Sequence, residues 1–213
     1  MTAASPLCSN IVALVARKRC GKDTLADVLG HEYGAHKLSF SDGVRAITSD
    51  LFPWVPSEVP DSIKDNVVDH PANVRGLTYR EVWRTVDHLR ANVDPHLFIN
   101  WFRDNQLDMA VKNPTLCFVI ARVSTAEEFA LLKALGIKTV RIIRKDMTGV
   151  DLDPFEDYLS QAEVDHEYLF DINDGTAPFL DFFREEVLWK SNQVWQQRSA
   201  LTSSLGICDG RTT

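Results

Sequence analysis

Long apolar runs are missing from this chain of 213 residues. No stretch approaches the ~20 consecutive apolar residues that a transmembrane helix needs. The first residues also show no basic segment followed by an apolar core, as a secretion signal would. We therefore expect no membrane partner and a location in the cytoplasm.

Cysteine is scarce, and the four cysteines are scattered at positions 8, 20, 117 and 208. They form no Cys-x-x-Cys pair and no cluster with histidine at the spacing of a zinc site. The six histidines are equally dispersed. These absences predict reduced thiols and argue against a metal site built from protein ligands alone.

Excess positive charge is also missing, because the formal net charge is −7. This balance argues against a protein that coats nucleic acid, although a local basic cleft is compatible with it. Stable binding to nucleic acid is therefore not expected, and small substrates suit the charge better. With 45% hydrophobic residues the chain can bury one substantial core, so we expect a single domain.

Short apolar runs rich in β-branched residues alternate with helical patterns along the chain. This alternation predicts an α/β fold, with a five-stranded parallel sheet flanked by helices. The strands are expected near residues 11–16, 36–40, 115–121, 139–143 and 168–172. The helices are expected near residues 24–31, 42–51, 78–91, 95–111, 125–135 and 178–196. The proline-rich stretch 52–60 cannot continue a helix and is predicted to be a loop or hinge.

The clearest motif follows the first predicted strand. Residues 16–24 read Ala-Arg-Lys-Arg-Cys-Gly-Lys-Asp-Thr and lead into a helical pattern. A strand, a turn with inward backbone N–H groups and a helix N-terminus together form a phosphate-binding loop. Gly21 lets the backbone approach a phosphate closely, and Lys22 supplies a point charge for the β- and γ-phosphates. The expected nucleotide-binding residues are Arg17, Lys18, Arg19, Cys20, Gly21, Lys22, Asp23 and Thr24.

Two positions depart from the general pattern G-x-x-x-x-G-K-[ST]. Ala16 stands where the first glycine is usual, and Asp23 stands where Ser or Thr normally meets magnesium. The Asp23 carboxylate and the Thr24 hydroxyl are the expected oxygen donors for Mg²⁺. Alternatively, Asp23 is an ordinary N-cap of the helix. Cys20 lies among cations near the helix N-terminus and is predicted to be the most reactive thiol.

The segments Lys18–Asp27 and Leu38–Arg45 resemble the deoxynucleoside monophosphate kinases of bacteriophages. The similarity continues through residues 80–90, 93–99 and 128–142 and ends at the turn of residues 172–176. The resemblance implies transfer of the ATP γ-phosphoryl group to the 5′-phosphate of a deoxynucleoside monophosphate, with ATP and Mg²⁺ as cofactors. It places the protein in the cytoplasm of the host if the chain is encoded by a phage. Whether the protein forms a homodimer stays open.

The resemblance also implies a P-loop kinase fold with a particular division of the chain. The core would comprise residues 10–50 and 113–196, and a helical acceptor-binding segment would span about 52–111. A lid would cover about 144–166, and residues 197–213 would form a tail.

Phosphoryl transfer needs positioning and charge neutralisation, so cations should surround the phosphates. On the acceptor side, Phe40 and Trp83 are candidates to hold the base, with core packing as the alternative. Asp42 would orient the sugar or a water molecule. The candidate acceptor-binding cations, any of which could instead be an ordinary surface charge, are Arg45, Lys64, Arg80, Arg84 and Arg90. Arg84 can only donate hydrogen bonds, so a base that it reads must present oxygen or ring nitrogen.

On the donor side, Arg144 is expected at the end of the fourth strand and would act with Lys22 on the transferring phosphate. Arg141 is expected to face outward along the same strand. The turn of Asn173, Asp174 and Gly175 resembles the loop that receives adenine, although a plain turn would use the same residues.

The third strand departs from the family pattern. The family commonly ends this strand with Asp-Val-Arg, whereas Arg122, Val123 and Ser124 stand here. Either Asp23 holds magnesium alone, or the side chain of Glu127 or Glu128 reaches the ion, or this alignment with the family pattern is out of register.

Three other functions also stay open. The chain could be a phosphomevalonate kinase of the animal type, a kinase for hydroxymethylated pyrimidines in DNA, or a nucleotide-binding module without turnover.

Overall fold

The computed structural model describes residues 10–17, 19–146, 158 and 161–188. The chain divides into two compact units. The first unit comprises the chain up to Leu38 and from Leu107 onward, and the second comprises Ser39–Gln106. The tail expected at 197–213, most of the expected lid and the C-terminal part of the last expected helix lie outside the described residues.

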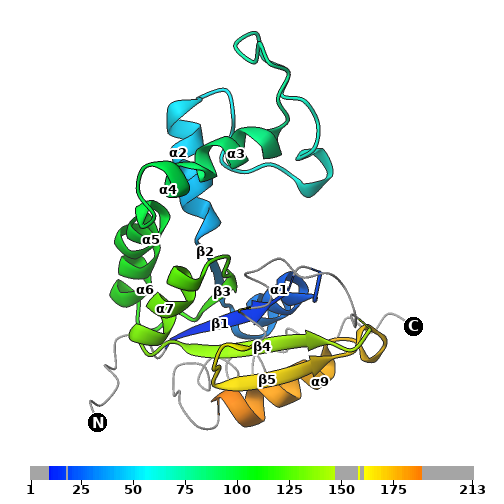
Figure 1. Cartoon of the computed structure of the whole chain (residues 1–213). Helices are drawn as coiled ribbons and strands as arrows, with labels where there is room; N and C mark the ends of the chain where they lie inside the picture. Colours follow the sequence, from blue (N-terminus) through cyan, green and yellow to red (C-terminus); the bar gives the residue numbers. More distant parts are fainter. Residues whose placement is uncertain (1–9, 18, 147–157, 159–160, 189–213) are drawn as a thin grey trace. The chain divides into compact units, whose positions relative to one another are not determined.

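The sheet has five parallel strands in the order β2-β3-β1-β4-β5, which confirms the predicted fold class (Figure 1). The strands are β1 (Ile11–Ala16), β2 (His36–Ser39), β3 (Phe118–Arg122), β4 (Lys138–Arg144) and β5 (His166–Phe170). The central strand β1 pairs with β3 and β4, and Ala13 lies beside Ile120 on one side and Thr139 on the other.

Strand β3 begins three residues later than predicted, because local hydrogen bonds hold the preceding residues in a turn. The N–H of Leu116 donates to the carbonyl of Asn113 at 3.0 Å. The buried side-chain amide of Asn10 donates to the carbonyl of Leu116 at 2.9 Å and to that of Ala110 at 3.2 Å. Asn10 thus ties the entry of β1 to the end of the helix before β3.

The helices of the first unit include α1 (Lys22–Tyr33), α6 (Asp108–Lys112), α7 (Ala126–Ala134) and α9 (Ala177–Phe182). The main core lies between the sheet, α1 and α9, where Val12 and Leu14 of β1 pack with Leu25, Leu29 and Phe179. Alternate residues of β1 therefore face this core, as the period of two in a strand requires.

The second unit is helical, with α2 (Ser41–Leu51), η2 (Asp61–Ile63), α3 (Tyr79–Asp87), α4 (Leu89–Asn92) and α5 (Leu97–Phe102) (Figure 1). Val44, Val86 and Phe98 form its small buried core. Residues 52–60 contain no helix or strand, as their prolines predicted. None of the described helices is long and apolar enough to cross a membrane.

Two predicted long helices contain π-helical turns. The helix expected at 95–111 consists of α5, the π-helical turn η3 (Arg103–Leu107) and α6. The helix expected at 178–196 begins as α9 and continues as the π-helical turn η5 (Phe183–Leu188). The hydrophobic period alone cannot reveal such a turn, because both helix types keep one side of the helix apolar.

Candidate active site

The loop between β1 and α1 has the backbone geometry of an anion site. Arg19 and Gly21 adopt positive φ values of 64° and 82°. Gly21 is the N-cap of α1, and among the described residues no side-chain hydrogen bond caps the first turn. The first N–H groups of the helix are therefore available to an anion, at the end where the helix dipole is positive. The alternative that Asp23 is the N-cap is wrong, because Asp23 lies inside the first turn.

Packing explains why glycine stands at position 21. A Cβ atom on Gly21 would lie 2.7 Å from Cε1 of Phe170, at the end of β5. Phe170 is 5% exposed and belongs to the main hydrophobic core. Backbone conformation and close contact thus both exclude a side chain here.

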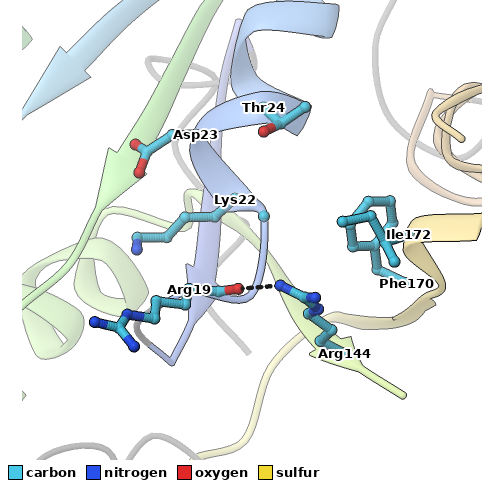
Figure 2. Close-up of a pocket in the computed structure, with 8 residues that line it drawn as sticks. Arg19, Lys22, Asp23, Thr24, Arg144, Phe170 and Ile172 are labelled. Carbon is cyan, nitrogen blue, oxygen red and sulfur yellow. Dashed lines mark hydrogen bonds between the residues drawn. The ribbon is translucent and has the colours of Figure 1, made fainter. Parts of the chain in front are cut away.

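A cavity of about 320 Å³ opens beside this loop (Figure 2). Its lining residues are Arg19, Gly21, Lys22, Asp23, Thr24, Arg144, Phe170 and Ile172. The structure therefore brings the predicted loop residues together with Arg144, from the end of β4. Sequence reasoning missed Phe170 and Ile172, and their one signal was a position at the carboxyl end of a predicted strand.

Among the described residues, two other predicted loop residues, Arg17 and Cys20, do not line the cavity. Lys18 lies outside the described residues, and Arg17 is half-buried. Cys20 is 2% exposed, so its thiol is not presented to solvent. This burial argues against the predicted reactivity, because alkylation requires access as well as a thiolate.

Arg144 is held beside the loop by three hydrogen bonds. Its Nη1 donates to the carbonyl oxygen of Arg19 at 2.9 Å (Figure 2). Its Nε and Nη2 donate to the carboxylate of Asp146 at 2.6 and 2.7 Å. The hydrogen bond with Asp146 raises the pKa of Arg144, and the guanidinium lowers the pKa of Asp146. The cation is thus oriented toward the loop by its own counter-ion.

Arg141 lies differently from the expectation. Its guanidinium donates to Glu167 of β5 and to the carbonyl of Ala162, and its side chain is only 14% exposed. Arg141 is therefore bound along the sheet instead of facing outward. The physical reason is the register of the two strands, which places Arg141 directly beside Glu167.

The side chains expected to hold magnesium are both exposed. Figure 2 shows Lys22 and Asp23 extending to one side of α1 and Thr24 to the other. Successive residues of a helix diverge by about 100°, so an ion on the Asp23 carboxylate would lie on the side of α1 where Lys22 would bind phosphates, whereas an ion on Thr24 would not. Within the described residues there is no group of three or more His, Cys, Asp or Glu side chains that could hold a metal ion.

The third strand supplies no acid, because β3 ends at Arg122, which is exposed. Glu128 is 3% exposed and accepts a hydrogen bond from the backbone N–H of Ser124 at 2.5 Å. Thr125, the N-cap of α7, accepts from the N–H of Glu128 in return. The Glu128 carboxylate therefore closes the start of α7, and the alternative that it reaches the metal is not supported by this geometry.

The turn expected to receive adenine forms the short 3-10 helix η4 (Ile172–Asp174), directly after β5. The carboxylate of Asp171 accepts from the backbone N–H and the side-chain amide of Asn173, both at 2.9 Å. The backbone hydrogen bond from Asn173 is the main reason why the pKa of Asp171 is lowered. Asp174 and Gly175 are exposed, and of this turn only Ile172 lines the cavity.

In the second unit, two predicted cations converge on one aromatic ring. The guanidinium carbon of Arg45 lies 5.5 Å from the ring centroid of Trp83, and Nζ of Lys64 lies 6.0 Å from it. Lys64 also pairs with Asp61, and the hydrogen bond from Lys64 lowers the pKa of Asp61. The indole N–H of Trp83 is buried and has no hydrogen-bond partner among the described residues. The cluster thus combines two positive charges with an unused donor.

The other predicted acceptor residues lie in different surroundings. Phe40 is 2% exposed and stacks on Phe102 at 4.1 Å between ring centroids. This contact supports the alternative in which Phe40 packs in the core and does not hold the base. Arg80 donates two hydrogen bonds to Asp65, at 2.6 and 3.2 Å, and this contact lowers the pKa of Asp65. Arg90 donates to Asp87 at 3.0 Å. Arg84 is exposed and forms no ion pair within the described part of the chain.

The fold and this loop define the class of the protein: an α/β protein with an all-parallel five-stranded sheet, consistent with a P-loop kinase fold. Over 155 residues, the chain is 24% identical to a protein of Acanthamoeba polyphaga mimivirus named "Putative deoxynucleotide monophosphate kinase". The match covers 68% of this chain and 80% of the viral protein. No family model matches the chain.

Proposed function

We propose that this protein is a kinase that transfers the γ-phosphoryl group of ATP to the 5′-phosphate of a deoxynucleoside monophosphate. The observation that carries the proposal is the cavity where the glycine-lysine loop meets Arg144. The name of the viral relative supports a deoxynucleotide as the acceptor.

The donor phosphates would lie on the first turn of α1. The N–H groups of this turn carry no side-chain cap, and Gly21 allows close approach. Lys22 would follow the β- and γ-phosphates, and Arg144 would face the transferring group from the end of β4. Such an arrangement supplies positioning and charge without covalent chemistry, which suits phosphoryl transfer.

A magnesium ion could bind at this site with only one or two ligands from the protein. Mg²⁺ commonly binds to one or two carboxylates together with substrate phosphates and water. Asp23 offers one exposed carboxylate beside Lys22, and Thr24 offers a hydroxyl on the next residue. When bound, the ion would neutralise negative charge on the phosphates.

The acceptor phosphate would lie near Arg45, Lys64 and the indole N–H of Trp83. These groups supply two charges and one donor that lacks a partner in the described structure. Arg84 is the candidate to read the base, while Arg80 and Arg90 bind neighbouring carboxylates.

The test is a screen of the purified chain with ATP, Mg²⁺ and a panel of monophosphates, with ADP and the new diphosphate both quantified. Lys22→Ala should abolish turnover while circular dichroism stays unchanged, because Lys22 would touch the phosphates in both ground and transition states. Transfer to phosphomevalonate or to hydroxymethylated DNA alone would replace the proposed acceptor. ATP binding without ADP release for any acceptor would indicate a module without turnover.

A further inference from the structure

Gln106 lies in the π-helical turn η3, between α5 and α6. A π-helical turn inserts an extra residue into a helix and so changes the direction of the side chains that follow it. Such turns are frequent at functional sites. Gln106 is partly buried and reaches the end of β2 at Ser39 and the first turn of α2 at Asp42, 67 and 64 residues earlier in the chain.

Both ends of the Gln106 amide are used. Its Oε1 accepts from the backbone N–H of Ser39 at 3.0 Å, and its Nε2 donates to Oδ2 of Asp42 at 2.7 Å. Because the backbone N–H of Ser39 can only donate and the carboxylate oxygen of Asp42 accepts, these partners determine the orientation of the amide. Ser39 and Gln106 are also the first and last residues of the second unit. The side chain therefore closes this unit at the point where it begins.

Asp42 passes this constraint to the cation cluster. One carboxylate oxygen accepts from Gln106, and the other lies 3.6 Å from Nη1 of Arg45. The Arg45 guanidinium in turn lies over the ring of Trp83. A contiguous series of contacts thus runs from Gln106 through Asp42 and Arg45 to Trp83.

We propose that Gln106 is a positioning residue for the acceptor: its amide holds Asp42, and Asp42 holds the Arg45 guanidinium over Trp83. The inference rests on the proposed function and adds a residue that the motifs did not indicate. The position requires a side chain that can donate and accept at once. Glutamate has the right shape but would turn a carboxylate toward Asp42.

Gln106→Glu is therefore the decisive substitution. It keeps the acceptor for the Ser39 N–H and replaces the donor to Asp42 by a like charge. A hydrogen bond to a charged group corresponds to roughly ten- to a hundredfold in an equilibrium constant. We expect KM for the monophosphate to rise by about tenfold or more, with KM for ATP unchanged.

Asn105→Asp is the matched control. Asn105 is the preceding residue of the same π-helical turn, is exposed and donates a side-chain hydrogen bond to the carbonyl of Trp101 at 2.8 Å. This variant adds the same charge one position away from the contact with Asp42, and both KM values should stay at the level of the unaltered protein.

A second measurement is independent of turnover. The indole N–H resonance of Trp83 can be followed in ¹H–¹⁵N spectra and assigned by its loss in Trp83→Phe. It should shift in Gln106→Glu and stay in place in Asn105→Asp, because only the first change displaces Arg45. If Gln106→Glu fails to fold, Gln106→Met removes both hydrogen bonds without adding charge and is measured in the same way.

The outcomes separate the two proposals. A shifted Trp83 resonance in a protein that phosphorylates no monophosphate would leave Gln106 as the residue that positions Arg45 and overturn the proposed function. An unchanged monophosphate KM and an unchanged Trp83 resonance in Gln106→Glu would overturn the positioning role. Equal increases in both KM values would also overturn it, since a general disturbance of the fold has that effect.

Discussion

At the scale of single residues, the candidate site depends on a contact between Gly21 and Phe170. The loop reaches its conformation because residue 21 has no side chain, and the ring of Phe170 fills the space that a Cβ atom would need. Phe170 thereby connects the end of β5 to the phosphate-binding loop. The phosphate-binding loop and Phe170, which lines the cavity, therefore pack directly against each other.

Gly21→Ala should destabilise the protein and impair ATP binding. The substitution combines a positive φ of 82° with a contact of 2.7 Å. Gly76→Ala is the control, since Gly76 has a φ of 63° but no atom within 4 Å of the added Cβ. The left-handed conformation alone costs roughly 1–2 kcal/mol. Urea unfolding should show that loss for Gly76→Ala and a larger one for Gly21→Ala, and only Gly21→Ala should weaken ATP binding. Equal losses would mean that Phe170 moves aside.

Asp23→Asn should raise the Mg²⁺ concentration needed for half-maximal turnover. Its carboxylate lies on the same side of α1 as Lys22, whereas the Thr24 hydroxyl lies on the other (Figure 2). Thr24→Ala should therefore change the Mg²⁺ requirement less. Titration of Mg²⁺ at saturating ATP measures both variants, and a larger effect of Thr24→Ala would assign the ion to the hydroxyl.

At the scale of elements, helix starts and helix interruptions decide which side chains are available for chemistry. The start of α1 lacks a side-chain cap and leaves its N–H groups to a ligand. The N-terminus of α7, in contrast, is capped by the side chains of Thr125 and Glu128, and these hydrogen bonds stabilise the helix. The π-helical turn η3 directs Gln106 toward α2.

Glu128→Ala should lower the free energy of unfolding by about 1–2 kcal/mol, the usual range for a lost helix cap. The Mg²⁺ requirement should not change, because the buried carboxylate serves α7. Glu127→Ala, in the same turn but exposed, is the matched control and should change stability less. A raised Mg²⁺ requirement in either variant would place the ion at the third strand.

At the scale of the whole molecule, each of the two units has its own core and its own set of ion pairs. In the first unit the sheet order places β1 between β3 and β4, so their carboxyl ends come together at the phosphate-binding loop. In the second unit, Asp61 pairs with Lys64 and Asp65 pairs with Arg80 at the surface. Surface pairs of this kind contribute little individually.

Stability should decline as the pH falls below about 4, near the ordinary pKa of aspartate. The pKa values of Asp61, Asp65, Asp146 and Asp171 are lowered in the folded protein. The unfolded chain therefore takes up protons first, and the stabilisation present above that pH is lost as the folded carboxylates protonate. Thermal unfolding between pH 3 and 7 measures this decline. Asp65→Asn should make it shallower, and a decline that begins near pH 6 would point to histidine instead.

Much of the fold follows from the sequence. The strands β1 and β4 were predicted to within one residue at each end, because both are short apolar runs enriched in β-branched residues and bounded by polar segments. The starts of β3 and β5 were misplaced by two or three residues. The start of β3 depends on the distant Asn10, whose side chain binds the carbonyl of Leu116. The end of β5, predicted two residues too late, depends on Asp171, whose side chain accepts from the N–H of Asn173 and favours the turn η4.

The sequence by itself determined the phosphate-binding loop and the parallel sheet, since both depend on local patterns: a glycine and lysine between a strand and a helix, and apolar runs alternating with helical periods. Only the tertiary structure decided that Phe170 closes over Gly21, that Phe40 and Glu128 serve packing and capping, and that Gln106 reaches Asp42. These contacts join residues that are distant in the chain or whose direction depends on a π-helical turn. Their residue types are compatible with several roles, so no local pattern distinguishes them.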